Sequence, residues 1–177
     1  MNNLIKRTLS SIILLPLALY FIVHGSFMLM FLTTICFVVA CYEWQMMTKK
    51  KSYKIYGFIF LIFSFYTFYE LSLEIFYGFF VIIICISTDI GGYVFGKIFK
   101  GPKLTKISPN KTYAGMIGGY FLSLVCLIII SNLIDHQTPI QFFLITILLS
   151  TVSQVGDIII SYFKRLSKIK NTGNIIP

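Results

Sequence analysis

The sequence predicts an all-α, polytopic integral membrane protein with about six transmembrane helices and both termini on the cytoplasmic side. Of the 177 residues, 57% are hydrophobic and 12% are charged, and the mean hydropathy is +0.86. This composition excludes an ordinary soluble domain. All fifteen Lys and Arg residues fall into four short stretches, and the apolar segments between those stretches come in pairs. Because cytoplasmic loops retain Lys and Arg, the four basic stretches belong on that side.

The apolar runs place the spans at roughly 8–23, 26–42, 55–69, 71–88, 113–134 and 139–161. Helices are expected because their backbone groups are satisfied internally, whereas a closed barrel needs an apolar and polar alternation that these runs lack. The third and fourth spans are short against the ~20 residues that cross a bilayer, and the fourth must accommodate Glu74 near its outer end. A signal peptide is an alternative for the first span, but five further spans follow and no convincing cleavage site is present.

The four cysteines lie within apolar spans, so neither a disulfide framework nor a CxxC metal site is indicated. The net charge of +9 is explained by topology and by attraction to anionic lipid headgroups, and no nucleic acid partner is predicted. We therefore expect a single membrane domain, residues 1–177, with cytoplasmic islands at residues 89–112 and 162–177.

The first island follows the predicted end of the fourth span and begins at Asp89. Four glycines between residues 91 and 101 would let backbone amides approach an anion, and Ser108, Lys111 and Thr112 lie where the fifth span begins. This arrangement predicts a phosphate-binding loop. Alternatively, Ser-Pro-Asn only caps the helix and the lysines anchor it at the interface.

The second island continues a polar stripe on the sixth span. Its members recur every three or four residues, which places them on one helix face: Ser150, Ser153, Gln154, Asp157, Ser161, Lys164, Arg165 and Lys168. A carboxylate is costly in lipid, so Asp157 must face a partner, a cavity or a cation. The alternative is a structural ion pair with Lys164, with Arg165 or with a lysine of the first island.

A phosphate-friendly loop, clustered cations and two carboxylates at one membrane boundary suggest phosphoryl transfer on a lipid. The stretch Ser161–Pro177 closely resembles the signature of phosphatidate cytidylyltransferases, the CDP-diacylglycerol synthases. The segments Ser108–Thr112 and Asp89–Lys97 and the pair Glu43-Trp44 are also similar to that family. The resemblance implies CTP and phosphatidate as substrates, Mg²⁺ as cofactor, membrane lipids as partners, a possible homodimer, and an active face on the cytoplasmic side. The abundance of Lys over Arg and of Ile, Phe, Tyr and Asn is the bias of codons rich in A and T, and it suggests a bacterial inner membrane.

The resemblance also implies a role for each matching residue. Asp157 would bind metal. Ser108, Lys111 and Thr112 would hold phosphates, and Asp89 would be a second polar ligand near the nucleotide. The catalytic cations that neutralise the developing charge would be Lys164, Arg165 and Lys170.

The sequence departs from the family pattern in three places. In the family the signature continues, after the position of Pro177, with Gly-His-Gly-Gly and an Asp-Arg-x-Asp element, whereas the given sequence stops at Pro177. Position 171 is Asn where the family usually has Asp, and position 114 is Ala where Glu or Gln is common. We therefore expect a chain truncated within the signature, with an incomplete metal site, low or no activity, and a largely retained fold.

Two other function classes remain open. A non-catalytic membrane subunit or anionic-lipid-binding protein fits the basic side of the chain and would survive the loss of Asp157. An ion-coupled transporter would also place Asp157 on a polar stripe, but such proteins commonly contain inverted repeats, which this sequence does not show.

Overall fold

The computed structural model describes residues 15–24, 26–48, 53–105, 108, 111–134 and 140–167. Within these ranges the regular elements are helices, apart from one isolated β-bridge between Lys103 and Thr112. The helices are α2 (Ser26–Met47), α3 (Lys54–Ser72), α4 (Ile75–Phe99), α5 (Tyr113–Ile134) and α6 (Ile140–Leu166). Residues 15–23 are also helical, and the preceding part of the first predicted span lies outside the described residues.

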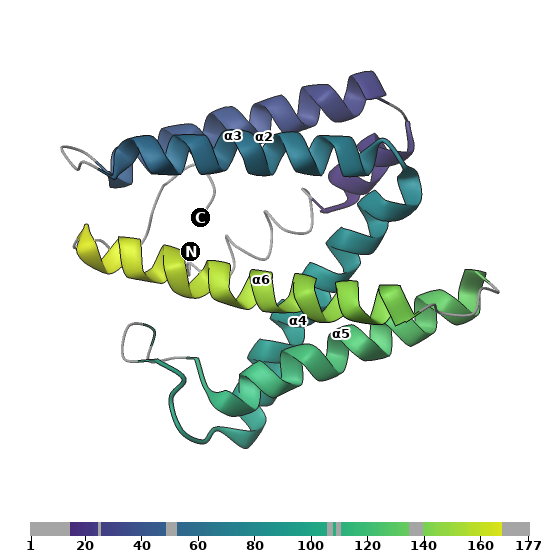
Figure 1. Ribbon diagram of the computed structural model, residues 1–177, viewed down its shortest axis with the longest axis vertical. Coiled ribbons are helices and arrows are strands. Elements are labelled where there is room, and N and C mark those ends of the chain that lie inside the picture. The colour runs from purple at the N-terminus through teal and green to yellow at the C-terminus, as the bar shows by residue number, and fades with distance from the viewer. Residues whose placement is uncertain are drawn as a thin grey trace. The chain divides into compact units, whose positions relative to one another are not determined.

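The helices α2 to α6 are each long and apolar enough to cross a membrane (Figure 1). Many of their large apolar side chains are exposed, among them Phe27, Phe63 and Ile140. Side chains of this kind are stable on a helix surface only when lipid or protein covers them. The predicted class, an all-α polytopic membrane protein, is confirmed, while the cytoplasmic placement of the termini stays a prediction.

Several helix ends differ from the predicted spans. The helix α3 has 19 residues and α4 has 25, so neither is short against a bilayer. Glu74 lies in the bend between them instead of inside the fourth span. The largest difference is at the end of α4, because residues 89–99 are helical although the sequence places them in the first island. Residues 162–166 are likewise part of α6 instead of an island.

The chain divides into two compact units, and the first contains α2, α3 and the last turn of α6. In this unit the indole Nε1 of Trp44 donates a hydrogen bond to the Lys54 carbonyl at 3.0 Å. The ring lies directly over Gly57, where a Cβ atom would overlap it. A glycine on α3 therefore lets the single tryptophan of the chain pack between the two helices.

The second unit is Phe80–Phe163, and it contains most of α4, all of α5 and most of α6. Its buried core is formed by Phe80, Ile84 and Leu127. Partly buried side chains from α5 and α6 pack around this centre, including Phe142 from α6. The charged pocket described below lies entirely within this unit.

Candidate active site

The helices α4 and α5 touch through glycines on both sides, and we call this contact the glycine seam: Gly91, Gly92 and Gly96 on α4 with Gly115 and Gly118 on α5. A Cβ at Gly91 would overlap the Gly118 carbonyl, and one at Gly115 would lie 2.6 Å from the Gly92 carbonyl oxygen. Small residues let helix backbones approach this closely in membranes.

The glycine seam corrects the predicted phosphate loop. Gly91, Gly92 and Gly96 lie inside a helix, where the backbone amides bond to carbonyls of the preceding turn and do not face an anion. The prediction was wrong for these three glycines because each glycine lowers helix propensity by only about 1 kcal/mol, which close packing against α5 offsets.

The segment after α4 folds back and fixes the start of α5. Lys100 and Gly101 have positive φ angles of 52° and 93°, a left-handed conformation that commonly ends a helix. The Leu104 amide then donates to the Lys111 carbonyl at 2.8 Å. The Tyr113 amide donates to the Pro102 carbonyl at 3.2 Å. These bonds hold Lys111 beside the first turn of α5.

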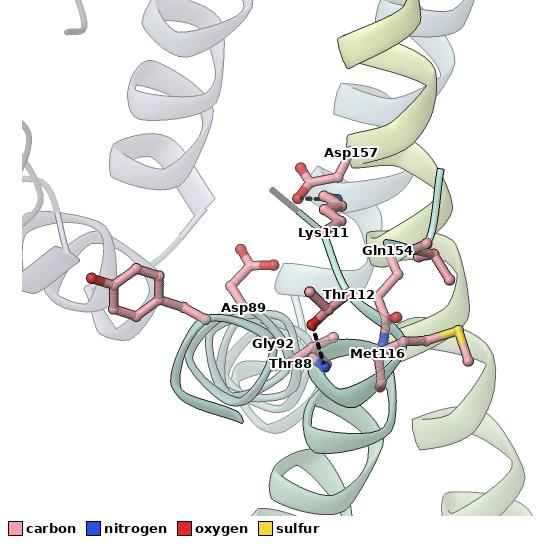
Figure 2. A pocket seen from close by; sticks show the side chains of 11 residues that line it. Thr88, Asp89, Gly92, Lys111, Thr112, Met116, Gln154 and Asp157 are labelled. Atoms are coloured by element: carbon pink, nitrogen blue, oxygen red, sulfur yellow. Dashed lines mark hydrogen bonds and ion pairs between the residues drawn. The ribbon is translucent and has the colours of Figure 1, made fainter. Parts of the chain in front are cut away.

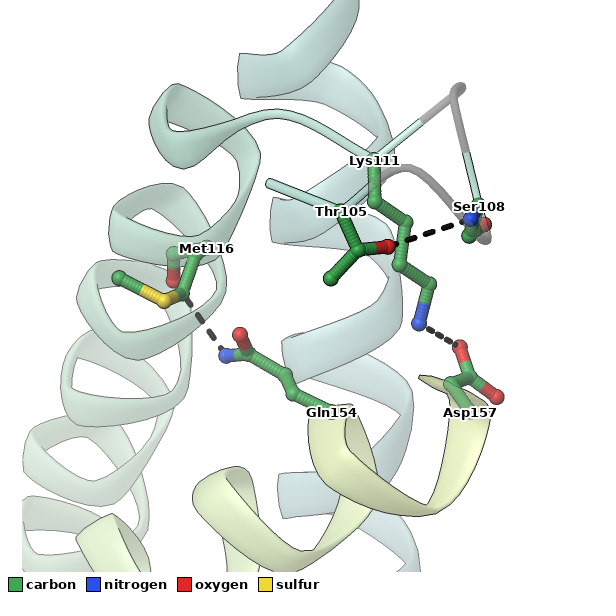
Figure 3. Close-up of polar contacts among 6 residues, drawn as sticks. All are labelled: Thr105, Ser108, Lys111, Met116, Gln154 and Asp157. Carbon is green, nitrogen blue, oxygen red and sulfur yellow. Dashed lines mark hydrogen bonds and ion pairs between the residues drawn. The ribbon is translucent and has the colours of Figure 1, made fainter. Parts of the chain in front are cut away.

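Thr112 is the N-cap of α5. Its Oγ1 accepts a hydrogen bond from the Gly115 amide at 3.1 Å, which satisfies one of the amides that a helix N-terminus leaves unpaired. The alternative prediction of a helix cap in this region is therefore correct in kind, but the capping side chain is Thr112. The Ser108 amide instead donates to Thr105 Oγ1 at 3.1 Å (Figure 3).

A pocket of about 240 Å³ lies where the second half of α4, the first turn of α5 and the second half of α6 meet. Figure 2 shows the carboxylates of Asp89 and Asp157 reaching this pocket from α4 and α6, with Lys111 entering from the loop before α5. The full lining is Thr88, Asp89, Gly92, Tyr93, Leu104, Lys111, Thr112, Gly115, Met116, Gln154 and Asp157.

The charged groups of the pocket interact with one another. Lys111 Nζ lies 2.8 Å from Asp157 Oδ2, with side chains 28% and 60% exposed, respectively (Figure 3). The Asp89 carboxylate is repelled by the Asp157 carboxylate and attracted by the Lys111 ammonium group, and it also interacts with the Ser153 hydroxyl. Of the partners that the sequence left open for Asp157, the structure selects the lysine of the first island.

Gln154 is a pocket residue to which the sequence assigned no role beyond the polar stripe. Its Nε2 donates to the Met116 carbonyl at 3.3 Å (Figure 3). A carbonyl can only accept, so the amide nitrogen must face α5, and Oε1 stays available as an acceptor. Pattern reasoning also missed Thr88 and Tyr93, whose place in the pocket depends on how the helices cross.

Of the remaining predicted site residues, the three that the structure describes do not line the pocket. Ser108 is described but is not among the lining residues. Lys164 and Arg165 lie in the last turn of α6 and belong to the first compact unit. Lys170 lies outside the described residues. The roles predicted for these four residues stay predictions.

The donors in the pocket fit a divalent cation of the magnesium type. Asp89, Asp157 and Gln154 offer oxygen atoms, the ligands that this ion prefers. Among the described residues, no group of three His, Cys, Asp or Glu side chains forms an all-protein cage. Magnesium is commonly held by only one or two carboxylates together with water and substrate phosphates, so two carboxylates suffice.

These observations define an integral membrane protein with a pocket that carries both signs of charge at one end of three packed helices. The chain belongs to the cytidylyltransferase family, whose sequence model matches residues 70–177. This range includes every residue that lines the pocket.

Named relatives agree with this family. The chain is 38% identical over 117 residues to the phosphatidate cytidylyltransferase of Staphylococcus aureus (strain COL), covering 64% of this chain and 45% of the relative. It is 42% identical over 92 residues to that of Staphylococcus haemolyticus (strain JCSC1435), covering 51% and 35%. The chain thus spans less than half of the length of these relatives. None of the solved structures matches it.

Proposed function

We propose that this protein transfers a cytidylyl group from CTP to phosphatidate, giving CDP-diacylglycerol and pyrophosphate for phospholipid biosynthesis. The observation that carries the proposal is the convergence of Asp89, Lys111 and Asp157 in one pocket, within the part of the chain that matches the family. A pocket with an ammonium and two carboxylates suits a reaction between two phosphate-bearing substrates.

In the proposed reaction, a phosphate oxygen of phosphatidate attacks the α-phosphorus of CTP. The new P–O bond forms as the bond to the β-phosphate oxygen breaks, and pyrophosphate leaves with that electron pair. Lys111 would neutralise negative charge on the phosphates. Thr112 Oγ1 already accepts the Gly115 amide, so its O–H remains able to donate to a phosphate oxygen.

Mg²⁺ is the proposed cofactor, and Asp89 and Asp157 would hold it. When bound, this ion supplies Lewis-acid polarisation and charge neutralisation at the phosphates. Asp157 is ion-paired to Lys111 at 2.8 Å. The proposed ligand of Mg²⁺ and the proposed partner of the substrate phosphates therefore lie next to each other.

We further propose that the pocket opens to the cytoplasmic side of a bacterial inner membrane. The pocket lies in the half of α4 that has exposed Lys97 in its last turn and is followed by exposed Lys100, and basic residues favour the cytoplasmic side. The resemblance alone supports a homodimer.

The test is transfer of labelled CTP into phosphatidate vesicles by the purified chain, and by the chain with any natural continuation beyond Pro177. We expect CDP-diacylglycerol and pyrophosphate in equal amounts, and strong loss of both in Lys111→Met. Glu70→Gln, an exposed acid on α3 outside the pocket, is the matched control and should keep full activity. Absence of product from both forms of the protein would overturn the proposal. The activity of the 177-residue chain by itself tests the prediction that this chain has low or no activity.

A further inference from the structure

A buried chain of hydroxyl groups links the three helices behind the pocket. Thr88 on α4, Ser123 on α5 and Ser150 on α6 are 1%, 0% and 0% exposed. The oxygen atoms of Thr88 and Ser150 lie 2.9 Å apart, and those of Ser150 and Ser123 lie 2.8 Å apart. Each helix therefore contributes one side chain to the same hydrogen-bonded chain.

The number of hydroxyl protons determines which group donates and which accepts in this chain of hydroxyl groups. Each hydroxyl has one proton to donate. Ser123 donates to the Tyr120 carbonyl at 2.9 Å, and Ser150 donates to Ser123. Ser150 must then accept from Thr88, whose proton is shared with the Ile84 carbonyl 2.8 Å away. The bonds run from α4 through α6 to the backbone of α5, so loss of the Ser150 hydroxyl removes both interhelical bonds, while Thr88 and Ser123 keep their own carbonyl partners.

The hydroxyl chain is next to the charged pocket in sequence and in space. Thr88 precedes Asp89 and itself lines the pocket. Ser150, Gln154 and Asp157 are separated by four and three residues, so they share one face of α6. A rotation of α6 about its axis would carry Gln154 and Asp157 away from the pocket together.

The glycine seam does not fix this rotation. It joins α4 to α5, whereas no described atom lies within 4 Å of a Cβ built at Gly156, the single glycine of α6. The hydrophobic effect at the core has no direction, so it does not by itself select one rotation of α6. The hydroxyl chain is directional and ties α6 to both other helices.

We propose that Thr88, Ser123 and Ser150 are positioning residues that set the rotation of α6 against α4 and so hold Asp89 and Asp157 at the same pocket. This inference rests on the proposed function of that pocket. Single interhelical hydrogen bonds in membrane proteins contribute little to stability, so their loss should leave the three helices folded. The principal effect is then on the geometry of the site.

The kinetic test compares Thr88→Val and Ser150→Ala with Ser87→Ala. Ser87 is also buried and is adjacent to Thr88, but its hydroxyl bonds only to carbonyls of its own helix, Ile83 and Ile84. We expect the first two variants to lower kcat about 10-fold or more with KM within about twofold, because small misplacements of reacting groups are costly. Ser87→Ala should keep the wild-type kcat, and Thr88→Ser, which retains the hydroxyl, should lower kcat less than Thr88→Val.

A structural readout separates this inference from the proposed function. Spin labels at Ile98 on α4 and Leu148 on α6, both exposed, report the distance between the helices once the native cysteines are replaced. We expect Thr88→Val and Ser150→Ala to shift or broaden the distance distribution and Ser87→Ala to leave it unchanged. If either variant fails to fold, Ser123→Ala takes its place, because it interrupts the same chain of hydroxyl groups.

Unchanged distributions in these variants, or changed distributions with an unchanged kcat, would overturn the inference. If the wild-type protein lacks transferase activity, the proposed function fails, and the distance distributions alone decide whether the hydroxyl chain sets the rotation of α6.

Discussion

Replacing Asp157 by Asn separates a catalytic role of this residue from a purely structural one. The substitution keeps the shape of the side chain and removes the charge that pairs with Lys111 at 2.8 Å. The two side chains are 60% and 28% exposed, and ion pairs at exposed positions contribute about 0–1 kcal/mol to stability. A loss of that size lowers the melting temperature of a chain of this length by at most about 4 °C.

The expected effect on catalysis is much larger. Removing one group that stabilises charge in a transition state commonly lowers kcat by about 10² to 10³. We therefore expect Asp157→Asn to lose at least about 99% of CDP-diacylglycerol formation, measured as initial rates in the form of the protein that is active. Thermal unfolding in detergent should change little, and Lys111→Met, which removes the same ion pair, should give a similar melting temperature.

The reasoning would be refuted by an Asp157→Asn variant with activity within twofold of the wild type. Asp157 would then be only a structural partner of Lys111, as one alternative from the sequence held. A fall of melting temperature by 10 °C or more, on the other hand, would contradict the assignment of this ion pair as weak.

Three further predictions concern packing. Gly118→Leu should destabilise the protein by about 2 kcal/mol or more through overpacking against α4, whereas Gly156→Ala should be neutral or stabilising, and thermal unfolding of the pair measures the difference. Gly57→Ala should displace the Trp44 indole and shift its fluorescence emission to longer wavelength; unchanged emission would contradict the close contact. Thr112→Val should cost about 1 kcal/mol and Thr112→Ser much less, because only a hydroxyl caps α5.

The sequence predicts the helices of this fold well because the apolar runs are long and the charges are sorted. The fifth span was placed at residues 113–134, which are the bounds of α5. The prediction fails where a helix continues through polar or glycine-rich sequence, as α4 does to Phe99. Local propensity favours a loop there, and only the contact with α5 shows why a helix forms.

The candidate site was predictable in its charged members. Asp89, Lys111, Thr112 and Asp157 were selected from the sequence, and all four line the pocket. Gln154 and Thr88 were not assigned to the site, because their roles depend on carbonyls and hydroxyls of other helices. The three- and four-residue spacing from Ser150 to Asp157 was the available signal, and it indicates the face of α6 but not its partners.

The glycine seam also limits how a lipid can reach the pocket. The two helices approach closely at Gly91, where a Cβ would overlap the Gly118 carbonyl, and the Phe95 side chain of α4 packs directly on Gly118. An acyl chain therefore finds no open gap between these two helices at this contact. A lipid whose headgroup binds beside Lys111 must diffuse in from another direction, which makes the α4–α5 contact a closed wall of the substrate path.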